Sequence, residues 1–220
     1  MENLSAILEP YQQTLGWLAS TAAVVQYFSG AVLCKDIYYN QSTYGISPTP
    51  FVGGLITAII MLKYALLLHN YTLLTVYTVS TTLHALYTMV YNYYSCDKVN
   101  DVYKPLSYGC AVITALYSYA SWEDPKVVQA RFGFIVTFLI LALISSPLLE
   151  LHEIIATKDA SRIPVPVTLI GSIGSIFWIL YGISLRDTYM VVQNVVALFL
   201  WSIQMGLCVK YPKEEIQSLN

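Results

Sequence analysis

One long apolar stretch of the chain carries polar side chains that could contact a solute. Residues 175–194 read SIFWILYGISLRDTYMVVQN and contain the indole of Trp178 and the carboxamide of Asn194. A carboxamide at membrane depth costs free energy unless it is buried against protein or lines a cavity. Asn194 is therefore a candidate binding residue, with a hydrogen bond between helices as the alternative. Trp178 is a second candidate, with core packing or a place in an interfacial aromatic belt as its alternatives.

The remaining reactive side chains do not form a catalytic or metal-binding pattern. The sequence shows no paired carboxylates within membrane depth, no nucleophile–base arrangement that can be recognised from spacing and no ligand spacing of a metal site. We expect His84 to be a hydrogen-bonded packing residue, with a proton relay as the alternative, and Glu150 to form a structural ion pair or a gate contact. Arg186 is expected to pair locally with Asp187, with an outer gate element as the alternative. The sequence thus predicts no enzyme, no catalytic residue, no metal and no cofactor. Four widely separated cysteines are predicted to be packing residues: Cys34, Cys96, Cys110 and Cys208.

The composition predicts an integral membrane protein. Of the 220 residues, 56% are hydrophobic and only 11% are charged, whereas a soluble domain has about 25% charged residues. The net charge of -2 provides no basic face, so we expect no nucleic-acid partner. Acidic residues at positions 2 and 9 do not match the basic start of a secretory signal peptide.

Apolar segments of about 20 residues, the length that crosses a bilayer, recur along the chain. They predict an all-α membrane protein with seven transmembrane helices and short connections. The predicted spans are 14–34, 48–68, 72–94, 105–121, 131–155, 165–185 and 189–211.

Lysine and arginine are distributed unevenly over the predicted loops and helix ends. With the N-terminus outside, seven basic residues lie on the cytoplasmic side and three on the other, which the positive-inside rule favours. Lys63 near the outer end of the second span is expected to snorkel. The cytoplasmic set is Lys35, Lys98, Lys104, Lys158, Arg162, Lys210 and Lys213, and the outer set is Lys126, Arg131 and Arg186.

The chain also repeats itself. A shift of 117 positions superimposes loops on loops and spans one to three on spans five to seven, which predicts two parallel three-helix repeats joined by an inverting fourth helix. The expected divisions are 1–95, a linker region 96–126, 127–211 and a tail 212–220. Such parallel repeats place a binding site at the repeat interface near the bilayer midplane. The identities are Gly16/Gly133, Ser29/Ser146, Ile37/Ile154, Ile46/Ile163, Gly54/Gly171, Tyr64/Tyr181 and Leu68/Leu185.

An ordered set of motifs over nearly the whole chain resembles the SWEET (MtN3/saliva) family of sugar transporters, in particular its animal members. The motifs are QYFSG (26–30), STYGISPTPF (42–51), LKYALL (62–67), SSPLLELHEII (145–155), ASRIPVPV (160–167), FWILYGISLRDTY (177–189), VVQN (191–194) and KYP (210–212).

The resemblance implies a facilitative, bidirectional carrier of mono- or disaccharides such as glucose or sucrose, without ion coupling. It assigns Trp178 and Asn194 to the central pocket. The family normally has an aromatic residue and an asparagine at the first-repeat equivalents, which here are Met61 and Tyr77. A pyranose offers a C–H face to an aromatic ring and rim hydroxyls to amides, so this chain retains one ring and one amide.

Small hydroxyl residues and prolines complete the predicted machinery. Thr57 and Ser80 are candidates to line the pocket beside Tyr77. The resemblance also implies hinge prolines, because a proline in a transmembrane helix frees a carbonyl and permits a kink. The residues at those places are Pro50, Pro147 and Pro166, with Gly30 as the first-span counterpart of Pro147 and with Pro48 and Pro164 as helix-start residues.

Other functions fit the sequence less well. A seven-span receptor is disfavoured by the repeat, by the short loops and by the lack of DRY and NPxxY patterns. A PQ-loop-like amino-acid carrier would share the architecture, but the sequence contains no Pro-Gln dipeptide. A third alternative is a non-transporting relative that acts through membrane partners. The plasma membrane is expected, with the Golgi or another endomembrane as the alternative, and the sequence leaves a homo-oligomer open.

Overall fold

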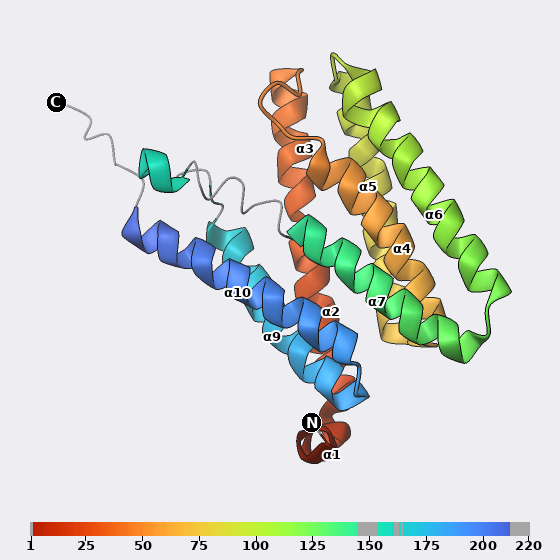
Figure 1. Ribbon diagram of the computed structural model, residues 1–220. Helices are drawn as coiled ribbons and strands as arrows, with labels where there is room; N and C mark the ends of the chain where they lie inside the picture. Colours follow the sequence, from red (N-terminus) through yellow and green to blue (C-terminus); the bar gives the residue numbers. More distant parts are fainter. Residues whose placement is uncertain (1, 145–153, 161–162, 164, 212–220) are drawn as a thin grey trace. The chain divides into compact units, whose positions relative to one another are not determined.

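The chain folds entirely into helices and connections over the residues that the computed structural model describes, which are 2–144, 154–160, 163 and 165–211 (Figure 1). The first half contains α1 (Glu2–Leu8), η1 (Glu9–Tyr11), α2 (Gln12–Tyr27), α3 (Ser29–Asn40), η2 (Thr49–Gly53), α4 (Gly54–Leu67) and α5 (Tyr71–Tyr94). The remainder contains η3 (Val99–Tyr103), α6 (Lys104–Trp122), α7 (Pro125–Ile144), α9 (Val165–Leu185) and α10 (Thr188–Lys210).

Each predicted span corresponds to helix within the described residues, with two notable differences. The first span is broken at Phe28 into α2 and α3, and α3 continues through Lys35 and Asp36 to Asn40. Helix propagation does not stop at a charge, so an apolar segment marks the membrane-compatible part of a helix and not its end. The fifth span begins earlier than predicted, at Pro125, which is a favoured residue at a helix start.

Four helical segments of the described chain are long and apolar enough to cross a membrane by length and composition. They are Asn3–Asn40, Thr49–Leu67, Val165–Leu185 and Thr188–Lys210. The tyrosine- and threonine-rich α5 has 24 residues, and α6 has 19, but both are more polar. The predicted total of seven spans therefore stays a prediction.

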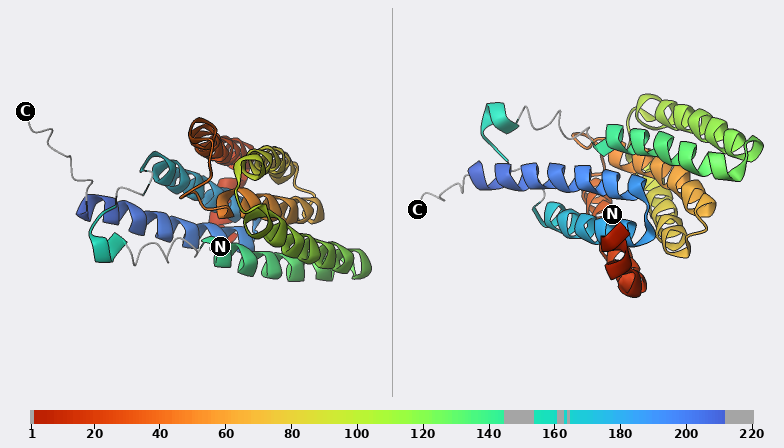
Figure 2. Two further views of the ribbon diagram at one scale, coloured as in Figure 1. Left: turned by 90° about the horizontal axis from the view of Figure 1, so that it is seen from above. Right: turned by 60° about the horizontal axis from the view of Figure 1, so that its bottom comes forward.

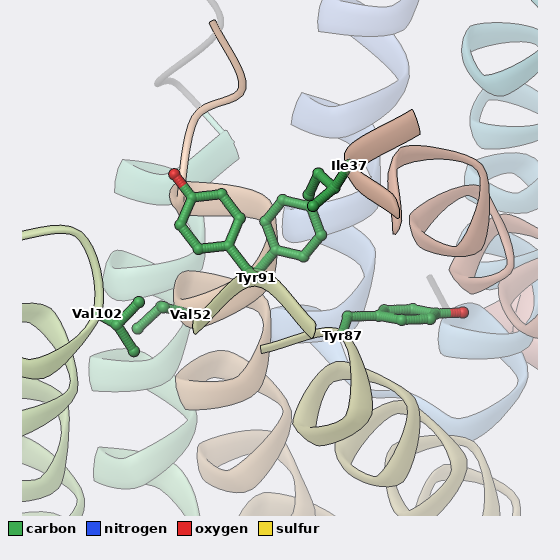
Figure 3. Packing of buried hydrophobic residues seen from close by; sticks show 6 residues of the cluster. Ile37, Val52, Tyr87, Tyr91 and Val102 are labelled. Atoms are coloured by element: carbon green, nitrogen blue, oxygen red, sulfur yellow. The ribbon is translucent and has the colours of Figure 1, made fainter. Parts of the chain in front are cut away.

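The chain divides into two compact units, and α2 and α7 each run from one into the other. Unit 2 comprises Ala23–Phe138, and its core lies where α3, η2, η3 and α5 meet. Tyr91 is at the centre of this core, next to Phe51, and its hydroxyl donates to the carbonyl oxygen of Ile46 at 2.9 Å (Figure 3). Val52 packs beside Val102 of η3 in the same cluster.

Unit 1 comprises Met1–Ala22 and Leu139–Asn220, and the antiparallel pair α9 and α10 dominates it (Figure 2). Glycine and serine on the buried face of α9, including Gly171, Gly174 and Ser175, permit close packing. The N-terminal helix α1 lies against α9. The sequence did not predict α1, because its seven residues are too few to span a membrane.

The connections α4–α5 and α9–α10 have the same backbone structure. His69 and Arg186, which are 117 positions apart, both adopt left-handed conformations with φ of 50° and 59°. The next residues, Asn70 and Asp187, cap the following helices by accepting a hydrogen bond from the amide three residues later, at 3.0 Å in each case. These turns fix where α5 and α10 begin, and these are the helices that carry Tyr77 and Asn194.

Candidate functional site

Trp178 lies in the middle of α9, where its indole is half-buried. The ring is packed edge-on against Tyr181, one turn later on the same helix, with centroids 5.9 Å apart and an interplanar angle of 66°. This contact restrains the indole from one edge. The role of this ring as a plate for a sugar stays a prediction.

Asn194 lies in α10 and is also half-buried. Its Nδ2 donates to the carbonyl oxygen of Met190, one turn earlier, at 2.9 Å. The bond uses one N–H group of the carboxamide within its own helix, and the Oδ1 atom of the same group is a hydrogen-bond acceptor. A hydroxyl group that donates is the natural complement of that oxygen.

The first-repeat equivalents of these residues have different surroundings. Met61 on α4 is almost fully buried, with 3% of its surface exposed, so it acts as a core residue in this conformation. Tyr77 on α5 is half-buried and makes a polar or ring contact of its own. Met61 is therefore more buried than its counterpart Trp178, whereas Tyr77 and its counterpart Asn194 are both half-buried.

The two small hydroxyl candidates are both engaged in local hydrogen bonds. Thr57 on α4 donates to the carbonyl oxygen of Gly53 at 2.7 Å. Ser80 on α5 is buried, and its Oγ lies 3.3 Å from Nδ1 of His84. The hydroxyl of Thr57 can still accept a further hydrogen bond, because its oxygen has two lone pairs. Ser80 also forms a side-chain hydrogen bond with Tyr27 on α2.

His84 is a hydrogen-bonded packing residue, as the sequence predicts. Its Nδ1 lies 2.8 Å from the carbonyl oxygen of Ser80. The imidazole packs against Tyr27 and Tyr87, with ring centroids 5.7 and 6.0 Å away. It also lies so close to Gly54 that a Cβ at that position would overlap the ring.

The second repeat contains the same arrangement with a different ring. Trp201 is the counterpart of His84, and it packs against Gly171, the counterpart of Gly54. A Cβ at position 171 would come within 2.7 Å of Cε2 of the indole. Both helix pairs thus use a glycine to admit a large ring, which brings the helix backbones close together.

The prolines with a predicted hinge role lie near helix starts where the structure describes them. Pro50 is in the first turn of η2, and Pro166 is the second residue of α9. Pro48 immediately precedes η2, as expected for a helix-start residue. Pro147, Pro164 and Glu150 lie outside the described residues. The hinge function of the prolines stays a prediction.

Arg186 and Asp187 each form a contact besides the local ion pair that the sequence predicts, and that ion pair stays a prediction. Nε of Arg186 donates to Oγ of Ser5 in α1 at 3.2 Å, and Asp187 caps α10. The left-handed backbone of Arg186 directs its side chain toward a segment 181 positions earlier, which local sequence cannot reveal. Lys63 extends over the ring of Tyr117, with Nζ 5.3 Å from the centroid.

The connection between α5 and α6 is ordered by polar contacts outside the predicted spans. The side chain of Ser95 donates to Asp101 at 2.8 Å, and Lys104 donates to Asn100 at 2.7 Å. The side-chain amide of Asn100 bonds to Asp97 and holds the pKa of that carboxyl below its usual value. These contacts fix the end of α5 and the start of η3.

Sequence reasoning missed two sets of buried polar groups. Thr168 and Gln204 are both buried on α9 and α10, and Oγ1 of Thr168 lies 3.5 Å from Oε1 of Gln204. On α5, the oxygens Oγ1 of Thr88 and Oδ1 of Asn92 are buried without a partner. Polar residues at helical spacing within apolar segments were the available signal. The described residues contain no group of three His, Cys, Asp or Glu side chains arranged to hold a metal ion.

Comparison with known proteins connects this architecture to one family. The family model described as "Sugar efflux transporter for intercellular exchange" (MtN3) matches twice, over residues 13–99 and 130–216. The two matches begin 117 positions apart, which is the offset of the internal repeat. The repeat is thus confirmed independently of the residue identities from which it was predicted.

Individual relatives and a solved structure support the assignment. The chain is 30% identical over 187 residues to "Sugar transporter SWEET1" of Mus musculus, covering 82% of this chain and 84% of the relative. It is 25% identical over 202 residues to "Sugar transporter SWEET1" of Drosophila pseudoobscura pseudoobscura, covering 89% of each. The fold matches a eukaryotic SWEET transporter structure with a TM-score of 0.82 at 21% identity, over 93% of this chain and 98% of the other. The chain belongs to the SWEET (MtN3) family, the sugar efflux transporters for intercellular exchange, and shares the all-helical membrane fold of that family.

Proposed function

We propose that this protein is a facilitative, bidirectional sugar transporter that moves mono- or disaccharides such as glucose or sucrose by alternating access. The observation that carries the proposal is the double match of the family model, with Trp178 and Asn194 at half-buried positions on two adjacent helices. Relatives in mouse and rice are named "Sugar transporter SWEET1" and "Bidirectional sugar transporter SWEET13".

The proposed sugar contacts differ between the two repeats. In the second, the Trp178 indole stacks on the C–H face of the pyranose and Oδ1 of Asn194 accepts from a rim hydroxyl. In the first, Tyr77 supplies a hydroxyl, Thr57 and Ser80 offer further acceptors, and Met61 provides apolar packing. A few neutral polar contacts and one ring give modest affinity, which suits a carrier that must release its solute on both sides.

The proposed topology has seven transmembrane helices in a 3+1+3 arrangement, with the N-terminus outside and the C-terminus in the cytoplasm. The excess of basic residues on the predicted cytoplasmic side supports this orientation. We propose the plasma membrane as its location. Hinges at Pro50, Pro147 and Pro166 would let the helices move between outward- and inward-open states.

A direct test is radiotracer uptake of a sugar panel in cells that lack hexose carriers, with surface expression measured in parallel. We expect uptake by the wild type that Asn194→Ala lowers roughly three- to tenfold at equal surface level, because one neutral hydrogen bond is lost. If the wild type took up none of the sugars in the panel although it was present at the cell surface, sugar transport would be contradicted.

One observation favours a second candidate, a non-transporting relative that acts through membrane partners. Met61 replaces the usual aromatic residue and is buried, and Tyr77 replaces the usual amide. The same uptake assay separates the two functions. A PQ-loop-like amino-acid carrier would take up no sugar, and it would take up labelled amino acids when these replace the sugars in the same assay.

A further inference from the structure

A stripe of polar side chains runs along α5 from Tyr77 toward the C-terminal end of the helix. At 3.6 residues per turn, the stripe lies within about 60° around the helix axis. Its length from Tyr77 to Asn92 is roughly 22 Å at 1.5 Å per residue, so it extends well beyond the proposed contacts at Tyr77. The stripe consists of Tyr77, Thr81, Thr88 and Asn92.

Thr88 differs from four other threonines of the same helix. Each of these four donates its hydroxyl to the carbonyl oxygen four residues earlier, at distances from 2.7 to 3.0 Å. The hydroxyl of Thr88 forms no hydrogen bond, although its side chain is 93% buried, with an exposed fraction of 7%. The four are Thr75, Thr78, Thr81 and Thr82.

One turn further along, Asn92 presents a second buried oxygen, Oδ1, which also has no partner. Buried polar atoms in native proteins are nearly always hydrogen-bonded, because an unsatisfied group loses its hydration without compensation. Two such atoms at positions i and i+4 lie on the same face of a helix. Both oxygens are acceptors, so they fit a ligand that donates O–H groups.

The fold by itself does not require these polar groups. At the positions 117 residues later, the second repeat has Leu198, Met205 and Val209 in place of Thr81, Thr88 and Asn92. An apolar stripe is thus compatible with the same helix. The polar one is specific to the repeat whose pocket amide has been replaced by Tyr77.

We propose that Thr88 and Asn92 form a second hydroxyl-binding position, which a sugar contacts in transit between Tyr77 and the C-terminal end of α5. The inference rests on the proposed sugar transport. In the conformation described here the two oxygens are covered, and alternating access would uncover them. An ordered water has the same hydroxyl chemistry, and the experiment must separate the two sources.

The test uses the full-length protein in proteoliposomes and compares counterflow of glucose with that of each monodeoxyglucose. The variants are Thr88→Val and Asn92→Leu, which remove the polar atoms with little change of shape. Thr82→Val is the matched control, because Thr82 is exposed on the same helix and its hydroxyl bonds to Thr78. Thr88→Ser retains the hydroxyl and should behave as wild type.

We expect the wild type to prefer glucose over at least one monodeoxyglucose, and Thr88→Val or Asn92→Leu to reduce that preference roughly three- to tenfold, the value of one hydrogen bond. Thr82→Val should leave it unchanged. Equal losses for glucose and every deoxy analogue would assign the site to water or to packing and overturn the inference. So would unchanged preferences in both variants.

The outcome also distinguishes the two proposals. Unchanged preferences in a transporting wild type would overturn only the second position, whereas a wild type that carries no sugar would overturn the proposed function and the second position with it. Misfolding is a minor concern, because removing an unsatisfied buried hydroxyl does not break any hydrogen bond. The thermal midpoint of each variant in detergent checks this.

Discussion

In the first repeat Asn70 caps α5 after the left-handed residue His69, and in the second Asp187 caps α10 after the left-handed residue Arg186. The backbone bonds that end the preceding helices correspond as well. The amides of residues 69 and 70 donate to carbonyls 66 and 65, and those of 186 and 187 donate to carbonyls 183 and 182. Every one of these positions is displaced by 117, so both hairpins are closed by the same backbone geometry.

The side chains on the helices of these two hairpins have diverged. Met61 and Tyr77 stand where the second repeat has Trp178 and Asn194. The stripe residues Thr81, Thr88 and Asn92 correspond to the apolar Leu198, Met205 and Val209 of α10. The glycine–ring contact is shared, but the ring is His84 in one repeat and Trp201 in the other. Backbone turns and close approaches therefore preserve the fold, while the chemistry of the interior can change separately in each half.

The largest expected effect tests whether the second repeat provides the aromatic plate alone. Trp178→Leu should lower sugar uptake at least tenfold, because a leucine offers no flat ring to the C–H face of a pyranose. Met61→Leu, a volume-conserving change at the equivalent buried place, should lower it by less than about twofold. Uptake normalised to surface expression measures both. Equal losses would mean that the two repeats contribute alike.

The next effect probes the shared glycine–ring contact. Gly54→Ala and Gly171→Ala should each destabilise the protein by about 1–3 kcal/mol, because the added methyl group displaces His84 or Trp201. The readout is the thermal midpoint in detergent. Gly206→Ala in α10 is the control, since a Cβ there meets nothing within 4 Å and alanine favours a helix. A wild-type midpoint for either of the first two variants would show that its ring moves without cost.

Replacing the helix caps should have a smaller and similar effect in both repeats. Asn70→Ala and Asp187→Ala each remove the acceptor for one backbone amide, at a cost of about 1 kcal/mol. The exchanges Asn70→Asp and Asp187→Asn should retain most of the stability, because either side chain can cap. If one alanine variant were neutral in the thermal measurement, the caps would not be equivalent.

The smallest effect should separate the two left-handed residues. Glycine relieves the positive φ at either position but increases the entropy of the unfolded chain, so His69→Gly should change stability by about 0.5 kcal/mol or less. Arg186→Gly also loses the hydrogen bond to Ser5, which should make it less stable than His69→Gly by about 1 kcal/mol. Equal midpoints would show that the Ser5 contact adds nothing.

Much of the helical framework could be predicted from the sequence. A membrane helix satisfies its own backbone and needs about 20 apolar residues, so composition alone marks where it lies. The predicted spans 165–185 and 189–211 agree with α9 and α10 within about one residue. The predicted bounds of span 14–34 were less accurate, because neither the break at Phe28 nor the continuation to Asn40 depends on hydropathy.

The candidate site was predictable in part. Residue types, the family resemblance and the repeat offset predicted four candidate sugar-binding residues, which are Trp178, Asn194, Met61 and Tyr77. They could not reveal that Met61 is buried, since burial depends on contacts with residues far along the chain. The functions of all these residues in binding remain predictions for the uptake assays.

By itself the sequence determined that this is a membrane protein of helices and that its two halves repeat with an offset of 117. These properties follow from composition and local spacing. Only the tertiary structure decided that Arg186 bonds to Ser5 and that His84 and Trp201 occupy equivalent glycine gaps. It also decided that Oγ1 of Thr88 and Oδ1 of Asn92 are buried without a hydrogen-bond partner. Each of these depends on which surfaces the folded helices cover, and that is a property of packing between distant segments.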